Sequence, residues 1–148
     1  MIDNPAYLIG DSSRLLRRAF DDRVRVHGVT GPQARLLLML SRHEGENQGY
    51  FAELLEVEAI TLCRMVDRME ESGLVERRRD PTDRRAWRLY LTARSNEIVA
   101  ELRGCVNALI DEIFAGVPDE DRAAFVRTMH TLRANLGVKR DSRIAANG

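Results

Sequence analysis

Between residues 58 and 91, the pattern of apolar and polar positions predicts a helix followed by a β-hairpin. Leu62, Val66 and Met69 recur four and three positions apart, so they share one face of a helix. Gly73 follows the last of them, where a helix commonly ends with a residue in the left-handed conformation. The first half of this stretch is therefore expected to be a short amphipathic helix.

The second half of the stretch is predicted to be a hairpin. Two strand-like runs, residues 74–78 and 87–91, flank the turn formers of residues 80–83. Upstream, residues 50–55 fit a short helix, and the turn at residues 56–57 has the length found inside a helix-turn-helix. A helix-turn-helix followed by a hairpin is typical of a winged helix, a class of DNA-binding domain.

Helical patterns also lie on both sides of this lobe. Residues 5–27 predict a first helix, and residues 32–43 a second one whose N-cap is Thr30, with Gln33 completing a capping box. Residues 92–115 and 119–136 predict two long helices, the last ending at Gly137. The expected fold class is mainly α with a small β-hairpin wing.

The two C-terminal helices carry more apolar surface than a winged helix needs to close its core. A surplus apolar stripe normally packs against a partner, and a symmetric homodimer is the simplest arrangement. We therefore expect a winged helix-turn-helix DNA-binding lobe at residues 31–91 and a helical dimerisation region at residues 1–30 and 92–137. A flexible tail is expected at residues 138–148.

Composition narrows the function classes. The chain has 23 basic and 23 acidic residues and no net charge, so any nucleic-acid surface must come from local clustering. No apolar run is long enough for a membrane span, and no signal peptide is apparent, so the cytoplasm is the expected location. The two cysteines and three histidines show no metal-ligand spacing, and no phosphate loop or nucleophile elbow occurs. We expect no enzymatic activity, metal or cofactor.

The predicted helix at residues 58–73 offers one face to DNA. Thr61 and Arg64 lie about one turn apart and away from the apolar stripe. Arginine can bind O6 and N7 of guanine together, which makes Arg64 the leading candidate for reading a base. The face expected in the major groove consists of Ala59, Ile60, Thr61, Arg64 and Arg68.

Six arginines lie between residues 76 and 88, and two of them directly follow the predicted turn at residues 80–83. Arg84 and Arg85 are close enough to the hairpin tip to reach a narrow minor groove. Adjacent residues on a hairpin do not point the same way. One of the two is therefore expected in the groove, while the other braces the wing through Asp83 or Asp67.

The wing sequence DPTDRRAWRLYLT, residues 80–92, resembles the wing of the MarR regulators. Residues 64–70 and 73–77 are similar to that family's recognition helix and first wing strand, and the order of helices matches over residues 5–136. Within the family, residues 113–117 and the serine at Ser95 resemble the SlyA branch.

The resemblance implies a homodimer that binds a pseudo-palindromic operator, with Arg85 as the residue inserted in the minor groove. It also implies control by small phenolic or carboxylate ligands held between the DNA-binding lobe and the dimer helices. A small aromatic carboxylate is the effector we expect, in a cleft between the first two helices and the start of the long helix. The candidate anion ligands are Arg14, Arg17 and Arg18.

The leading hypothesis is thus a ligand-responsive transcriptional regulator, acting as a repressor. Two alternatives stay open at this point. One is a redox-sensing regulator that uses the thiol of Cys63 in the recognition helix. The other is an architectural DNA-binding protein without a ligand.

Overall fold

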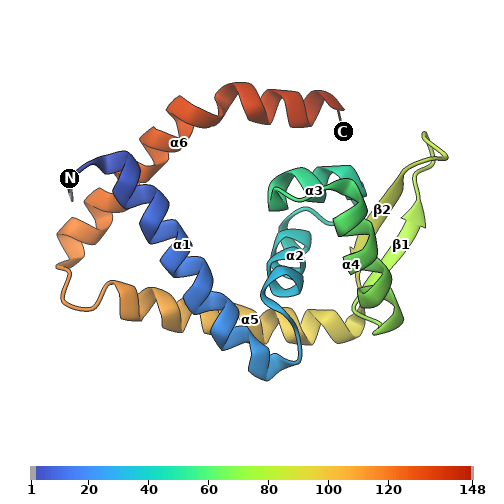
Figure 1. Ribbon diagram of the computed structural model, residues 1–148, viewed down its shortest axis with the longest axis horizontal. Coiled ribbons are helices and arrows are strands. Elements are labelled where there is room, and N and C mark those ends of the chain that lie inside the picture. The colour runs from blue at the N-terminus through green and yellow to red at the C-terminus, as the bar shows by residue number, and fades with distance from the viewer. Residues whose placement is uncertain (1–2, 148) are drawn as a thin grey trace. The chain divides into compact units, whose positions relative to one another are not determined.

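The computed structural model describes the backbone of residues 3–147 and the side chains of residues 3–137. It is mainly helical, with one two-stranded antiparallel hairpin, which confirms the predicted fold class (Figure 1). The chain divides into two compact units, Met1–Leu109 and Ile110–Gly148. The elements are α1 (Pro5–Val24), the 3₁₀ helix η1 (Arg25–His27), α2 (Gly31–Arg42), α3 (Gln48–Leu55), α4 (Ala59–Glu71), β1 (Val75–Arg79), β2 (Trp87–Leu91), α5 (Ala93–Ile113) and α6 (Asp119–Asn147).

The first three α-helices begin at side-chain caps. Asn4 accepts hydrogen bonds from two backbone N–H groups of α1, and Asn47 accepts one from α3. At α2, Thr30 and Gln33 form the reciprocal capping box expected from their spacing. Each such cap satisfies amides that would otherwise lack a partner and stabilises its helix by about 1 kcal/mol.

The core of the first unit is centred on the apolar stripe of α4. Leu62, Val66 and Met69 are fully buried, as their spacing predicts. They pack with buried side chains of α2, α3 and the hairpin, among them Leu36, Leu37, Leu40, Phe51 and Leu89. Burial of each such side chain contributes roughly 1.5–3 kcal/mol, so α4 is held by its inner face and presents the opposite face to solvent.

The hairpin pairs Val75 with Leu91 at its base and Arg79 with Trp87 toward its tip. It begins one residue later than predicted, because the N–H of Leu74 still bonds to the carbonyl of Met69 in the last turn of α4. On the other side of β2, the N–H of Gly45 and the carbonyl of Glu46 bond to Leu89. These bonds cover part of an edge that would otherwise be unpaired.

The start of α5 is joined to the end of α4. Thr92 and Ser95 cap each other reciprocally, with each hydroxyl accepting the other's backbone N–H at 3.1 and 2.8 Å. The Thr92 hydroxyl also donates to the carbonyl of Gly73 at 2.6 Å. Ser95 is fully buried, so its hydroxyl serves this junction and has no access to solvent.

In the second unit, the rings of Phe114 and Phe125 meet edge to face, and the Arg122 guanidinium lies over Phe114. The helix α6 does not end at Gly137 as predicted, but continues to Asn147. One glycine costs a helix only about 1 kcal/mol, and the lysine, arginines and alanines that follow are good helix formers. Whether residues 138–148 form the predicted flexible tail stays untested, because only their backbone, through residue 147, is described.

Candidate nucleic-acid interface

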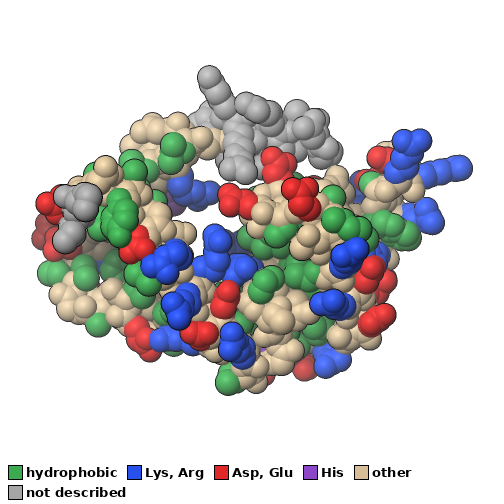
Figure 2. Space-filling view, viewed as in Figure 1, with side chains coloured by type: hydrophobic (Ala, Val, Ile, Leu, Met, Phe, Trp, Pro, Cys, Tyr) green, Lys and Arg blue, Asp and Glu red, His purple; other side chains and the backbone are tan. Residues whose placement is uncertain are grey.

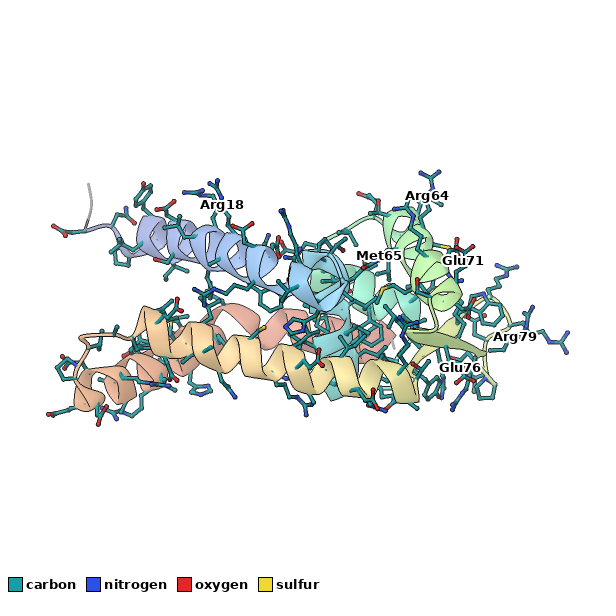
Figure 3. All side chains as sticks on the ribbon, turned by 90° about the horizontal axis from the view of Figure 1, so that it is seen from below. Arg18, Arg64, Met65, Glu71, Glu76 and Arg79 are labelled. Atoms are coloured by element: carbon teal, nitrogen blue, oxygen red, sulfur yellow. The ribbon has the colours of Figure 1, made fainter. Side chains whose placement is uncertain are left out.

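The solvent-facing side of α4 carries all five residues expected to meet DNA. Arg64 projects away from the body of the first unit, and the Ile60 side chain is 58% exposed (Figure 3). The exposed residues of this face are Ala59, Ile60, Thr61, Arg64 and Arg68. Because the opposite stripe is buried, these side chains lie free on a helix whose orientation is set by the core.

The N-terminal end of α4 is left open. Its N-cap, Glu58, makes no side-chain hydrogen bond to the helix, in contrast to the caps of α1, α2 and α3. Amide N–H groups at the start of a helix attract anions, including DNA phosphates. This end of α4 is therefore able to receive a phosphate as well as a base edge.

The turn between α3 and α4 is short and sharply defined. Glu56 adopts the left-handed conformation, with φ 56° and ψ 43°. A non-glycine residue pays roughly 1–2 kcal/mol there. Hydrogen bonds from the amides of Glu56 and Val57 back to α3 offset this strain. The turn holds α3 across α4 in the manner of a helix-turn-helix.

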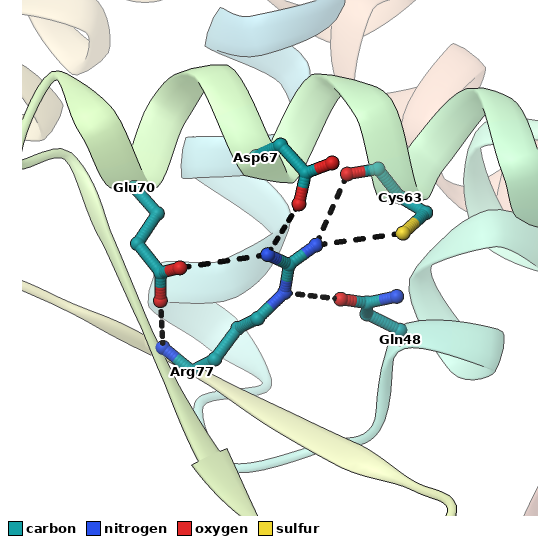
Figure 4. A network of polar contacts seen from close by, with 5 residues as sticks. All are labelled: Gln48, Cys63, Asp67, Glu70 and Arg77. Atoms are coloured by element: carbon teal, nitrogen blue, oxygen red, sulfur yellow. Dashed lines mark hydrogen bonds and ion pairs between the residues drawn. The ribbon is translucent and has the colours of Figure 1, made fainter.

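Arg77 of β1 ties the hairpin to α4 (Figure 4). Its guanidinium donates to Oδ1 of Asp67 at 2.5 Å, to the carbonyl of Cys63 at 3.0 Å and to Oε1 of Gln48 at 2.7 Å. Glu70 accepts both the Arg77 backbone N–H, at 3.2 Å, and a longer contact from the guanidinium. Only 12% of the Arg77 side chain is exposed, so this arginine is structural. The sequence pattern placed it in the basic cluster and did not reveal its partners.

Three further arginines of the hairpin are held by neighbours. Arg78 pairs with Glu76 and lies over the Tyr90 ring, and Arg79 lies over Trp87. Arg88 pairs with Asp80 at 3.2 Å. The ion pairs and ring contacts of these side chains stiffen the wing.

Arg84 and Arg85 are exposed at the hairpin tip, where basic side chains gather in Figure 2. Among the described residues, neither side chain has a hydrogen-bond or ion-pair partner. Asp67 and Asp83 were expected to brace the side chain of one tip arginine, but neither carboxylate does so. Asp67 binds Arg77, and Asp83 accepts the backbone N–H of Arg85 at 2.9 Å, because a tip residue lies closer to its own turn than to α4.

The turn itself is shaped by Asp80. Its carboxylate accepts the backbone N–H and the hydroxyl of Thr82, at 2.8 and 2.7 Å, as well as the Arg88 guanidinium. The hydrogen bonds from Thr82, followed by the contact with Arg88, lower the pKa of Asp80 to about 2. Asp80 is therefore ionised at neutral pH and holds the loop that presents Arg84 and Arg85.

The three arginines considered for ligand binding all lie exposed on α1. Arg14 pairs with Asp11 at 2.8 Å, and Arg18 points away from the helix into solvent (Figure 3). A cavity of about 470 Å³ lies nearby, between the end of α1 and the start of α2. The residues that line it are Asp21, Arg25, Gly28, Val29, Thr30, Gly31 and Pro32, so its single arginine is not one of the three.

Two other properties bear on the kind of site present. Within the described residues, no group of three or more histidine, cysteine, aspartate or glutamate side chains has a geometry suited to a metal ion. No helix of that part of the chain is long and apolar enough to cross a bilayer.

Comparisons with known proteins agree with the winged-helix architecture of the chain. The MarR family model matches residues 27–86, the stretch from the end of η1 to the hairpin tip. The match covers the winged-helix part of the chain, and solved structures extend the likeness to most of its length. A crystal structure of MarR is 27% identical and covers 95% of this chain and 96% of its own, with a TM-score of 0.83.

Two further MarR structures share the fold. A MarR family transcriptional regulator from Silicibacter pomeroyi is 28% identical, covers 90% of each chain and has a TM-score of 0.76. A MarR variant from E. coli, solved in complex with operator DNA, is 21% identical and has a TM-score of 0.72. That comparison covers 86% of this chain and 91% of the other. The winged helix of this chain is thus the MarR winged-helix fold.

Proposed function

We propose that this chain is a transcriptional regulator of the SlyA-like branch of the MarR family, which binds a pseudo-palindromic operator as a homodimer and acts as a ligand-responsive repressor. The observation that carries the proposal is the exposed face of α4, held at a set distance from the arginine tip of the wing by Arg77. A base-reading helix and a minor-groove hairpin act together only when their spacing is constrained.

The roles within the interface follow from exposure and chemistry. Arg64 is assigned to guanine in the major groove, with Ala59, Ile60, Thr61 and Arg68 beside it. Arg85, or its neighbour Arg84, is assigned to the minor groove. The neighbour of the same fold that was solved with operator DNA supports duplex DNA as the partner.

The proposed homodimer accounts for apolar surface that each unit leaves exposed. On α1, Tyr7 is 60% exposed and Leu15 is 50% exposed, and in the second unit Phe125 is 52% exposed. A monomer rarely leaves several large apolar side chains of one helix in water. A second copy that covers these faces would place two α4 helices for half-sites roughly one helical turn apart.

Selection from random duplex DNA tests the proposal. Wild-type protein should enrich an inverted repeat. Arg64→Ala should lose about 1–3 kcal/mol on the enriched site and much less on random DNA. Arg133→Ala, which removes an exposed arginine of α6, is the matched control and should keep wild-type affinity. Equal weakening of Arg64→Ala on both DNAs would assign Arg64 to the phosphate backbone, and no enrichment by wild type would favour an architectural protein.

For the effector, we propose a small aromatic carboxylate bound by the α1 arginines, of which Arg17 and Arg18 are the freer pair. Titration of such acids into the protein–operator complex should release DNA. If the acid binds about 1.4 kcal/mol more tightly to a dimer whose α4 helices are spaced wrongly for the two half-sites, operator binding weakens tenfold. Alanine variants of Arg14, Arg17 and Arg18 test the site. If acids bind while operator affinity stays constant, the coupling is absent; if every variant responds like wild type, the anion site lies elsewhere.

One observation favours a second candidate, a redox regulator that uses Cys63. Its Sγ lies 3.6 Å from Nη2 of Arg77, so the thiol is part of the contact that joins the wing to α4. Modification of Cys63 would disturb the contact that joins the wing to α4. Operator release by a thiol-blocking reagent in wild type, with no release in Cys63→Ala, would support this function; identical behaviour of the two proteins would exclude it.

A further inference from the structure

A second group of reactive side chains lies in the first unit, outside the DNA interface. His27 ends η1, and its ring lies against α5, where Glu101 and Cys105 are one turn apart. Nδ1 of His27 is 2.8 Å from Oε2 of Glu101, and Nε2 is 3.1 Å from Sγ of Cys105. The three side chains come together from positions 74 and 78 residues apart, which no local sequence pattern reveals.

The contacts of the His27 ring determine which of its nitrogens carries the hydrogen. A carboxylate only accepts hydrogen bonds, so the Nδ1 atom that faces Glu101 carries the hydrogen. The Nε2 atom of neutral His27 then presents its lone pair to the Cys105 thiol. A nucleophile, a base within hydrogen-bond reach and a third group that orients the base form the arrangement that activates thiols and hydroxyls. Here Glu101 also stabilises the imidazolium that forms when His27 takes the thiol proton.

The group is accessible to small molecules. Cys105 is half-buried, the His27 side chain is 20% exposed and the Glu101 side chain is 59% exposed. The position of His27 is held by Gly28, whose φ of 77° ends η1 and whose N–H bonds to the carbonyl of Arg25. A cysteine that only fills a core is sealed among apolar side chains and inert. Cys105 instead faces a base at a partly open junction between η1 and α5.

We propose that Cys105 is a thiol activated by His27 that reacts with small carbonyl-conjugated alkenes, and that Glu101 is the positioning residue. His27 takes the proton, and the Cys105 sulfur attacks the β-carbon of the alkene to form a carbon–sulfur bond. The π electrons pass to the carbonyl as the carbon–carbon double bond breaks, and the α-carbon receives the proton from the imidazolium. The product is a thioether, and no oxidant or reductant is consumed.

N-ethylmaleimide is a suitable probe, because it is a carbonyl-conjugated alkene of small size. Trypsin releases Cys105 in the peptide of residues 104–122 and Cys63 in that of residues 43–64, so mass spectrometry follows both thiols in one reaction. In the folded wild-type protein, Cys105 should react at least about tenfold faster than the same cysteine in a synthetic peptide of residues 104–122. A rate equal to or below that of the free peptide overturns the proposal.

Variants separate activation from packing. His27→Asn should bring the Cys105 rate down to that of the peptide. Glu101→Ala should give an intermediate loss, and Glu101→Gln should recover part of it, because an amide oxygen still accepts the Nδ1–H. Glu97→Ala removes a carboxylate one turn earlier on α5 and should leave the rate unchanged. If His27→Asn unfolds the chain by circular dichroism, the two substitutions at the exposed Glu101 decide. Full wild-type reactivity in Glu101→Ala, or in folded His27→Asn, refutes the assignment.

Discussion

Arg77→Met tests whether the wing is fixed to α4 by a polar contact. The arginine is the point where β1, α4 and the start of α3 meet, through Asp67, Cys63 and Gln48 (Figure 4). Methionine keeps an unbranched apolar stem of similar length, so the aliphatic packing is largely preserved. The substitution therefore removes the hydrogen bonds of the guanidinium with little change in volume.

The expected loss follows from those contacts. Three short hydrogen bonds, to Asp67, Cys63 and Gln48, contribute about 1 kcal/mol each in net terms, or about 3 kcal/mol together. The carboxylates recover part of this by rehydration, because Asp67 is 56% exposed and Glu70 is 45% exposed. We therefore expect Arg77→Met to lower the free energy of unfolding by about 2 kcal/mol.

Urea unfolding at one fixed protein concentration measures this loss, since dimerisation would otherwise shift the midpoint. The midpoint should fall while the slope with denaturant stays constant. Arg78→Met is the control, because the neighbouring arginine is exposed and contacts only Glu76 and Tyr90 among the described residues. An Arg77→Met midpoint equal to that of wild type would show that the junction is held by apolar packing alone. A double-mutant cycle with Asp67→Asn should give a coupling of at least about 0.5 kcal/mol.

Three other substitutions or truncations probe the remaining interface. Arg85→Ala should weaken operator binding, and in a selection assay it should lose the preference for A·T pairs that flank the site. A changed base preference at the positions read by α4 would contradict the minor-groove role. Since the hydrogen bonds from Thr82 lower the pKa of Asp80 from 3.8 to about 2, this carboxylate stabilises the wing turn above pH 3.8, and the effect is lost as pH falls toward 2. Trp87 fluorescence should report that acid transition in wild type and lose it in Asp80→Asn. Deletion of residues 119–148 should leave an aggregated or largely unfolded chain in circular dichroism, because it removes apolar side chains worth roughly 1.5–3 kcal/mol each when buried; a soluble monomer with unchanged operator affinity would refute this.

Local signals in the sequence were sufficient for most of the fold. Thr30 and Gln33 form the predicted capping box, and β2 spans the predicted residues 87–91. Errors of one or two residues arose where a boundary depends on one particular hydrogen bond. The α3 helix begins at Gln48, earlier than predicted, because the Asn47 side chain caps it. Such boundaries depend on side-chain geometry, which periodicity does not record.

The candidate DNA residues were visible in the sequence for a similar reason. Helical spacing alone separates Thr61 and Arg64 from the buried stripe of α4, and the structure exposes both. Contacts between distant segments were not visible. Gln48 and Arg77 are 29 positions apart, and His27 and Cys105 are 78 apart. A count of arginines predicts a basic wing, but only the fold reveals which of them already have a partner.

That distinction changes how the wing is understood. Of its six arginines, Arg77 is nearly buried and Arg88 pairs with Asp80, while Arg78 and Arg79 stack on aromatic rings of β2. These four stiffen the hairpin through contacts within the first unit, and their charge is already partly compensated. In the proposed function, Arg84 and Arg85 supply the charge that meets DNA, at the tip of a hairpin that the other four hold in place. A chain with no net charge can therefore present a concentrated positive field at one point, because acidic residues pair with three of the four arginines that build the wing, Arg77, Arg78 and Arg88, and not with the pair at its tip.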